Sequence, residues 1–343
     1  MKVQQAIKNM TNGKIAPVYV ALGTESYLQD QFKDFLVNLI PAEEQEFNVG
    51  RYDMEAVNLS VAIDDARSIP FFGEHRLVLL ERPYFLTGTH QKNALDHDLD
   101  GLLQYLKNPE SATIFVIMAP YPKLDERKKL TKQLRKTAEF IDCKPLTERD
   151  VRAALSTKLQ GQGWKIEPAA LELLLERTGA ELSAIMGELP KLVLATQDTK
   201  VISKKEVNAL VARSFEQNIF DLVDLVLERK VNAALTMYRE LLLQKEEPLK
   251  INAILEGQFR LMLQVMILRE HGFDQGSMTK QIKAHPYRIK LALRKNRRFK
   301  RIDLQNAYLG LVHVEEKMKS SAVDPELLFQ LFLLNFSQHQ GVA

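Results

Sequence analysis

Cysteine and long apolar runs are scarce in this 343-residue sequence. Cys143 is the single cysteine, so no internal disulfide can form, and a zinc site built on several thiolates is disfavoured. The longest apolar stretches, "TIFVIMA" and "LLFQLFLLNF", fall well short of the roughly 20 residues that a membrane helix needs. The opening "MKVQQAIKNM" lacks the apolar centre of a secretory signal. We therefore expect a cytoplasmic chain without membrane contact.

A strong excess of one charge is also missing. Lys and Arg number 47 and Asp and Glu 44, a net charge of +3, so the total charge does not indicate a nucleic-acid partner. One segment differs, because from Lys280 to Arg301 ten residues are basic and none is acidic. Two interpretations stay open for it: contact with a polyanion, or pairing with acidic residues of a neighbouring domain or subunit.

The chemistry of a phosphate-binding loop is absent too. A strand-like run that ends at Gly23 leads into a helix-like segment, but the connection reads "GTESYLQDQ", without the second glycine, the lysine and the hydroxyl of G-x-x-x-x-G-K-[ST]. Glu25 at the start of that helix would repel a phosphate. The strand "RLVLLER" ends in Glu81 and Arg82, which is not a paired acidic magnesium site. The geometry is that of an NTPase, but we expect neither ATP hydrolysis nor a bound cofactor.

Other catalytic and metal-binding patterns are missing as well. The sequence has no H-E-x-x-H and no G-x-S-x-G. His90 and His97 fall in a polar segment and are interpreted as solvated loop residues. Asp125 and Glu126 are interpreted as acids in the first turn of a charged helix. We therefore predict no catalytic residue and no metal site.

What is present has an α/β start and a helical remainder. Over residues 1–146 strand-like and helix-like segments alternate, which is typical of a parallel sheet. Thr24 and Thr147 stand where helix N-caps are expected. From Thr147 onward the pattern is helical throughout, and we predict a small helical domain at 147–211 and an all-α domain at 212–343.

Two adjacent phenylalanines, in "SIPFFGEHRLVLLE", occupy the bend between a helix and a strand. Pro70 ends the helix near Ile69, and Gly73 permits the turn into the strand. Because Phe71 and Phe72 are neighbours, a regular strand cannot bury both rings on one face. The residues alone leave two interpretations: a loop folded onto the core, or a hydrophobic peg for another protein.

Several segments together resemble the delta-subunit family of the bacterial DNA polymerase III clamp loader. They are "GKIAPVYVALGTESYL", "SIPFFGEHRLVLLE", "GAELSAIMGELPKLVLAT", "FEQNIFDLVDLVL" and "HPYRIKLALR", in this order over essentially the whole chain. The resemblance implies an AAA+-like α/β domain without a working phosphate loop, a helical AAA+ lid domain, and an all-α collar domain used for oligomerisation. It further implies that sibling motor subunits bind and hydrolyse ATP, so that this chain has no catalytic activity of its own within the DNA polymerase III holoenzyme.

The same resemblance assigns roles to residues. The motif that contacts the sliding clamp, the beta subunit, falls on Ser68, Ile69, Pro70, Phe71 and Phe72, with Phe71 where the family often has leucine. Contacts with the motor subunits and delta prime are expected through the collar. The basic residues expected to contact these subunits or primed DNA are Arg288, Arg294, Lys295, Arg297, Arg298, Lys300 and Arg301. The alternatives are a degenerate AAA+ nucleic-acid-binding ATPase, and a DNA-binding adaptor without clamp contact.

Overall fold

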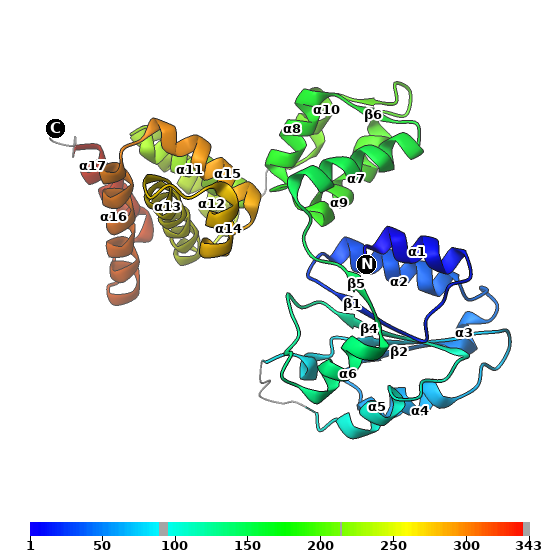
Figure 1. The fold of residues 1–343 in the computed structure, drawn as a ribbon. Helices are drawn as coiled ribbons and strands as arrows, with labels where there is room; N and C mark the ends of the chain where they lie inside the picture. The colour runs from blue at the N-terminus through cyan, green and yellow to red at the C-terminus, as the bar shows by residue number, and fades with distance from the viewer. Residues whose placement is uncertain (89–94, 213–214, 339–343) are drawn as a thin grey trace. The chain divides into compact units, whose positions relative to one another are not determined.

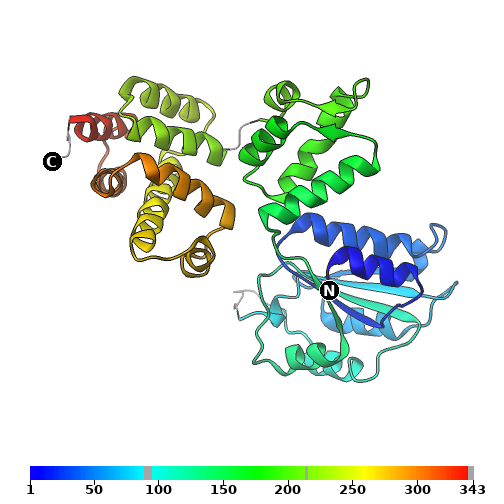
Figure 2. The same ribbon diagram turned by 45° about the horizontal axis from the view of Figure 1, so that its top comes forward.

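The computed structural model describes residues 1–88, 95–212 and 215–338 (Figures 1 and 2). The chain divides into two compact units, Met1–Leu146 and Thr147–Ala343. The first unit is a parallel sheet with helices on both faces, and the second is mainly helical.

The sheet of the first unit has five strands, all paired in parallel, in the order β2-β3-β4-β1-β5. The strands β1 and β4 lie inside the sheet and are buried along their whole length, as continuous apolar runs in a parallel sheet covered on both faces should be. The strands are β1 (Val18–Leu22), β2 (Val49–Asp53), β3 (Arg76–Glu81), β4 (Thr113–Ala119) and β5 (Glu139–Asp142).

Helices cover both faces of the sheet (Figure 1), and alternate residues of a strand face different layers of them. Val18 and Val20 of β1 share a core with residues of α4, α5 and α6. Tyr19, between them, points to the opposite face, where its ring lies 5.9 Å from that of Phe32 in α2. The helical elements are α1 (Val3–Thr11), α2 (Ser26–Asn38), α3 (Gln45–Asn48), α4 (Leu59–Arg67), η1 (Tyr84–Leu86), α5 (Leu99–Tyr105) and α6 (Lys129–Thr137).

The start of the second unit combines four helices with two very short strands. Thr147 is the N-cap of α7, as predicted, and its side chain accepts a hydrogen bond from the Asp150 backbone N–H at 3.2 Å. The expectation of a helical pattern throughout is wrong at β6 and β7, because a two-residue strand has no alternation that a sequence could display. The elements are α7 (Glu148–Gly161), β6 (Lys165–Ile166), α8 (Pro168–Arg177), α9 (Leu182–Ala195), β7 (Val201–Ile202) and α10 (Lys204–Leu210).

The remainder of the second unit is helical, with a continuous apolar core that includes Tyr238 and Phe329, whose rings stack at 4.2 Å. Helix α13 is long and apolar enough to cross a membrane by length and composition, but it buries residues such as Leu255 and Phe259 in this core. The elements are α11 (Phe215–Leu227), α12 (Val231–Leu243), α13 (Pro248–Glu270), α14 (Gln275–Ile282), α15 (Pro286–Lys295), η2 (Asn296–Arg298), α16 (Arg301–Ser320) and α17 (Pro325–Gln338).

The predicted N-cap at Thr24 is wrong. Helix α2 begins at Ser26, and Glu25 occupies the N-cap position without a side-chain cap. The reason is a tertiary contact, because the backbone N–H of Glu25 donates to the carbonyl of Cys143 at 2.9 Å and holds the chain in an extended turn.

Candidate binding loop and the closed phosphate loop

The segment Ser68–Phe72 forms an exposed loop between α4 and β3. Helix α4 ends at Arg67, two residues before the predicted end, and Ser68 is already extended. The exposed fractions are 83% for Ile69, 67% for Phe71 and 57% for Phe72. Both rings are therefore outside the core, and the interpretation of the loop as core packing is wrong.

A third aromatic residue, Phe47 of α3, joins the two loop rings. The rings of Phe47 and Phe71 stack at 5.5 Å, and those of Phe71 and Phe72 meet edge to face at 4.7 Å. Phe47 is itself 49% exposed. We call Phe47, Phe71 and Phe72 the aromatic cluster. The sequence pattern gave no sign of the aromatic cluster, because Phe47 reaches the loop from a separate short helix, α3.

The side chain of Asn48 holds the backbone of the loop by hydrogen bonds. It is fully buried, its Nδ2 donates to the carbonyl of Phe72 at 2.6 Å, and its Oδ1 accepts from the backbone N–H of Phe71 at 2.9 Å. One amide thus satisfies the two main-chain groups that carry the exposed rings. Asn48 is a positioning residue for the aromatic cluster.

An ion pair joins the two elements that flank the loop, α4 and β3. The Arg76 Nε of β3 donates to Asp65 Oδ1 of α4 at 2.8 Å, and both side chains are largely buried. Burial and the neighbouring Asp65 carboxylate raise the pKa of Tyr52 to about 12, so this phenol stays neutral. Gly73 closes the loop with φ +72, in the left-handed region that favours glycine. The loop thus starts and ends at fixed points.

Replacement of Asn48 by alanine should loosen this loop. The change leaves the Phe71 N–H and the Phe72 carbonyl without their partner, and we expect the free energy of unfolding to fall by about 2 kcal/mol. Hydrogen exchange of the Phe71 amide should become at least about tenfold faster. Asn12→Ala, at an exposed asparagine after α1, is the control and should change neither quantity. Unchanged exchange at Phe71 would contradict the positioning role.

The connection "GTESYLQDQ" is closed by hydrogen bonds within the protein. The backbone N–H of Gly23 donates to the Ala119 carbonyl at 3.2 Å, and that of Glu25 donates to Cys143. The Gln29 Nε2 donates to the Gly23 carbonyl at 2.6 Å. These amides are therefore directed at protein carbonyls, whereas a phosphate loop directs its amides at the ligand.

The predicted basic residues of the second unit divide into two groups. Arg294, Arg297 and Lys300 are exposed and form no ion pair with any residue that the structure describes, and Arg288 is half-buried. The others form ion pairs within the unit: Lys295 with Asp224 at 2.7 Å, Arg298 with Glu228 at 2.5 Å, and Arg301 with Glu270 at 3.2 Å. Pairing with acidic side chains thus accounts for part of the basic run.

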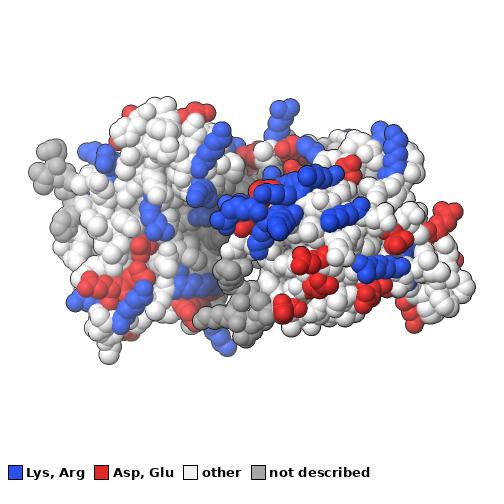
Figure 3. Space-filling model, turned by 60° about the horizontal axis from the view of Figure 1, so that its bottom comes forward, with Lys and Arg blue, Asp and Glu red and all other residues white. Residues whose placement is uncertain are grey.

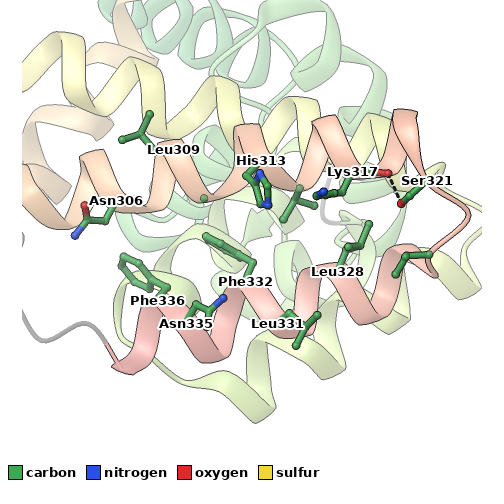
Figure 4. A pocket seen from close by; sticks show the side chains of 13 residues that line it. Asn306, Leu309, His313, Lys317, Ser321, Leu328, Leu331, Phe332, Asn335 and Phe336 are labelled. Atoms are coloured by element: carbon green, nitrogen blue, oxygen red, sulfur yellow. Dashed lines mark hydrogen bonds between the residues drawn. The ribbon is translucent and has the colours of Figure 1, made fainter.

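An apolar groove lies between α16 and α17 (Figure 4). Its volume is about 610 Å³, and Leu328, Leu331 and Phe332 of α17 face His313 and Lys317 of α16 across it. Leu309 and Leu331, at its rim, are largely exposed. The groove has the apolar lining of a protein-binding surface.

The remaining candidates serve the fold. His97 is buried and not solvated, as its Nδ1 accepts from the Leu59 backbone N–H at 3.2 Å and its Nε2 lies 3.0 Å from the Met54 carbonyl. Burial lowers the pKa of this imidazole. His90 lies outside the described residues. Over residues 1–88, 95–212 and 215–338, no three His, Cys, Asp or Glu side chains gather in a group that could hold a metal ion.

Comparison with known proteins points to one family. Residues 19–144 match the family model described as DNA polymerase III, delta subunit, and residues 216–336 match DNA polymerase III delta subunit, C-terminal domain. DNA polymerase III subunit delta of Bacillus subtilis is 38% identical over 328 residues, which are 95% of this chain and 94% of that protein. A probable DNA polymerase III subunit delta of Aquifex aeolicus is 24% identical over 246 residues, 70% of each chain.

A solved structure agrees with these sequence matches. The Bacillus subtilis DNA clamp loader delta protein superposes with a TM-score of 0.68 at 37% identity, and the match covers 98% of this chain and 100% of that one. The similarity therefore extends over both units.

Proposed function

Because the chain belongs to the DNA polymerase III delta-subunit family of clamp-loader proteins, we propose that its aromatic loop binds the sliding clamp and helps to open the ring for loading onto primed DNA. The observation that carries this proposal is the exposure of Ile69, Phe71 and Phe72 on a loop whose backbone is fixed by a buried asparagine. Apolar side chains held in advance at a surface lose little entropy on binding.

Three apolar anchors do not supply the whole affinity. Micromolar binding needs about 8 kcal/mol, and three hot-spot side chains at about 2 kcal/mol each supply about 6 kcal/mol. We therefore propose that Phe47 and the neighbouring surface of α4 also contact the clamp. In this proposal the aromatic cluster holds one face of the clamp, and the adjacent helix α4 distorts the interface at which the clamp ring opens.

We propose further that this chain leaves ATP to the other subunits of the loader. The backbone N–H groups of Gly23 and Glu25, after β1, donate to protein carbonyls, and the lysine and the Mg²⁺-binding hydroxyl of a working site have no counterpart in "GTESYLQDQ". The chain is a loader component without a catalytic reaction of its own, and we place it in the cytoplasm.

The collar role belongs to the region from α11 to α17. We propose that the groove between α16 and α17 takes an apolar surface of a neighbouring loader subunit, a motor subunit or delta prime. Arg294, Arg297 and Lys300, which have no ion pair among the described residues, are the proposed contacts to a subunit or to primed DNA. The division of the second unit at residues 211 and 212 into lid and collar is part of this proposal.

Two equilibrium titrations of the full chain test this function. The chain should bind the purified sliding clamp with a Kd in the micromolar range or below, and it should show no saturable binding of a fluorescent ATP analogue at concentrations up to about 1 mM. Saturable micromolar binding of the analogue would support the alternative of a degenerate ATPase. Absence of clamp binding together with DNA binding would support the adaptor.

A further inference from the structure

Helix α6 of the first unit carries a stripe of lysines on its exposed face. The helix contains no acidic residue, and it packs against the sheet through Leu130 and Leu134. Lys129, Lys132 and Lys136 are exposed. Their spacing of three and four residues places them in one row about 10 Å long. We call these three residues the lysine stripe.

The charge of the lysine stripe is not neutralised by its own surroundings. The nearest acids in sequence serve other residues, as Asp125 pairs with Arg127 at 2.8 Å and Glu126 with Arg135 at 2.6 Å. No lysine of the stripe forms an ion pair with a residue that the structure describes. Like charges three and four residues apart destabilise a helix, so this arrangement is unfavourable without a partner.

Figure 3 looks at the side that contains this helix, and lysine and arginine side chains gather there in one group. Two other basic side chains of the segment, Lys128 and Arg135, contact groups of the first unit. Lys128 Nζ donates to the Phe85 carbonyl at 2.6 Å, and the Arg135 guanidinium lies 4.0 Å above the Phe140 ring. The three lysines of the stripe form no such contact with the residues that the structure describes, so they are available to a polyanion.

We propose that the lysine stripe of α6 binds phosphate groups of double-stranded DNA, as a second DNA contact separate from the basic residues of the collar. The structure itself indicates a polyanion as the ligand of the stripe, and the choice of DNA as that polyanion rests on the proposed function. A duplex carries a phosphate charge every ~1.7 Å along its axis, so a row of this length meets several phosphates. Surfaces that hold single strands add exposed aromatic side chains for stacking, and the Phe140 ring beside α6 is covered by Arg135.

The test is duplex binding by the full chain, measured by fluorescence anisotropy over a series of salt concentrations. The variant is Lys129→Gln with Lys132→Gln and Lys136→Gln. The matched control is Lys8→Gln with Lys14→Gln and Lys144→Gln, three exposed lysines outside α6 that lose the same charge. We expect the lysine-stripe variant to bind on the order of a hundredfold more weakly at 0.1 M salt and the slope of log K against log salt to fall by about 2.7.

Three results overturn the inference: an unchanged slope, an equal loss in the control, or no measurable duplex binding by the original chain at low salt. Clamp binding by the same variant should stay at its original strength. A separate variant, Arg294→Gln with Arg297→Gln and Lys300→Gln, reports on the collar contact. An effect of the collar variant without an effect of the lysine-stripe variant removes this inference and leaves the proposed function standing.

Discussion

Phe71→Ala combined with Phe72→Ala should weaken clamp binding by the full chain on the order of a thousandfold and leave the circular dichroism spectrum unchanged. Both rings are more than half exposed, so their loss opens no cavity in the core. Two truncated hot-spot side chains cost about 4 kcal/mol of binding free energy, at about 1.4 kcal/mol for each factor of ten. Surface plasmon resonance with immobilised clamp measures this loss.

The control uses exposed apolar residues elsewhere. Leu194→Ala with Leu243→Ala removes two leucines of the second unit that are 66% and 83% exposed. This variant should bind the clamp as the original chain does. Phe71→Leu should also retain binding, because leucine keeps an apolar anchor at this exposed position. Full clamp affinity of the double phenylalanine variant would refute the assignment of the loop.

The first unit shows how far the sequence alone determines the fold. The runs that became β1 and β4 are apolar at nearly every position, so a parallel sheet covered on both faces was predictable. The rings of Phe71 and Phe72 were expected to be hard to bury, since adjacent residues cannot share a face. Local chemistry therefore predicted the sheet, whereas for the loop it left two interpretations open, packing on the core and exposure at the surface.

Contacts between distant residues were beyond such reasoning. Asn48 and Phe72 are 24 residues apart, and nothing in "FNVGRYDM" indicates that the asparagine holds a loop. Likewise, Asp224 lies 71 residues from Lys295, so the partial neutralisation of the basic run depends on how α11 and α15 pack. The error at Thr24 has the same origin, because the Glu25 N–H donates to Cys143, which follows the neighbouring strand β5 but is distant in sequence.

Gly23→Ala is expected to destabilise the first unit by about 4 kcal/mol or more, because overpacking against a backbone that cannot move adds to the cost of a positive φ. Gly23 has φ +147, and a Cβ there would lie 2.0 Å from the carbonyl carbon of Cys143. That carbonyl accepts the hydrogen bond from the Glu25 N–H, and Cys143 directly follows β5. Neither the Gly23 segment nor the Cys143 segment can therefore move away without breaking hydrogen bonds at this edge of the sheet. The connection between β1 and α2 thus depends on a glycine for its close approach to Cys143.

Substitutions at two other glycines separate the cost of the positive φ from the cost of the close contact. Gly13 has φ +77, and a Cβ there would meet no atom within 4 Å, so Gly13→Ala should cost only about 1 kcal/mol. Gly161, at the end of α7, has neither a positive φ nor a close neighbour, and Gly161→Ala should be neutral or slightly stabilising. Hydrogen exchange of the β1 amides measures the first two changes, and the fluorescence of Trp164, the single tryptophan, reports on the second unit. If the β1 amides of the Gly23→Ala variant exchange as slowly as those of the Gly13→Ala variant, close packing against Cys143 does not hold this loop closed.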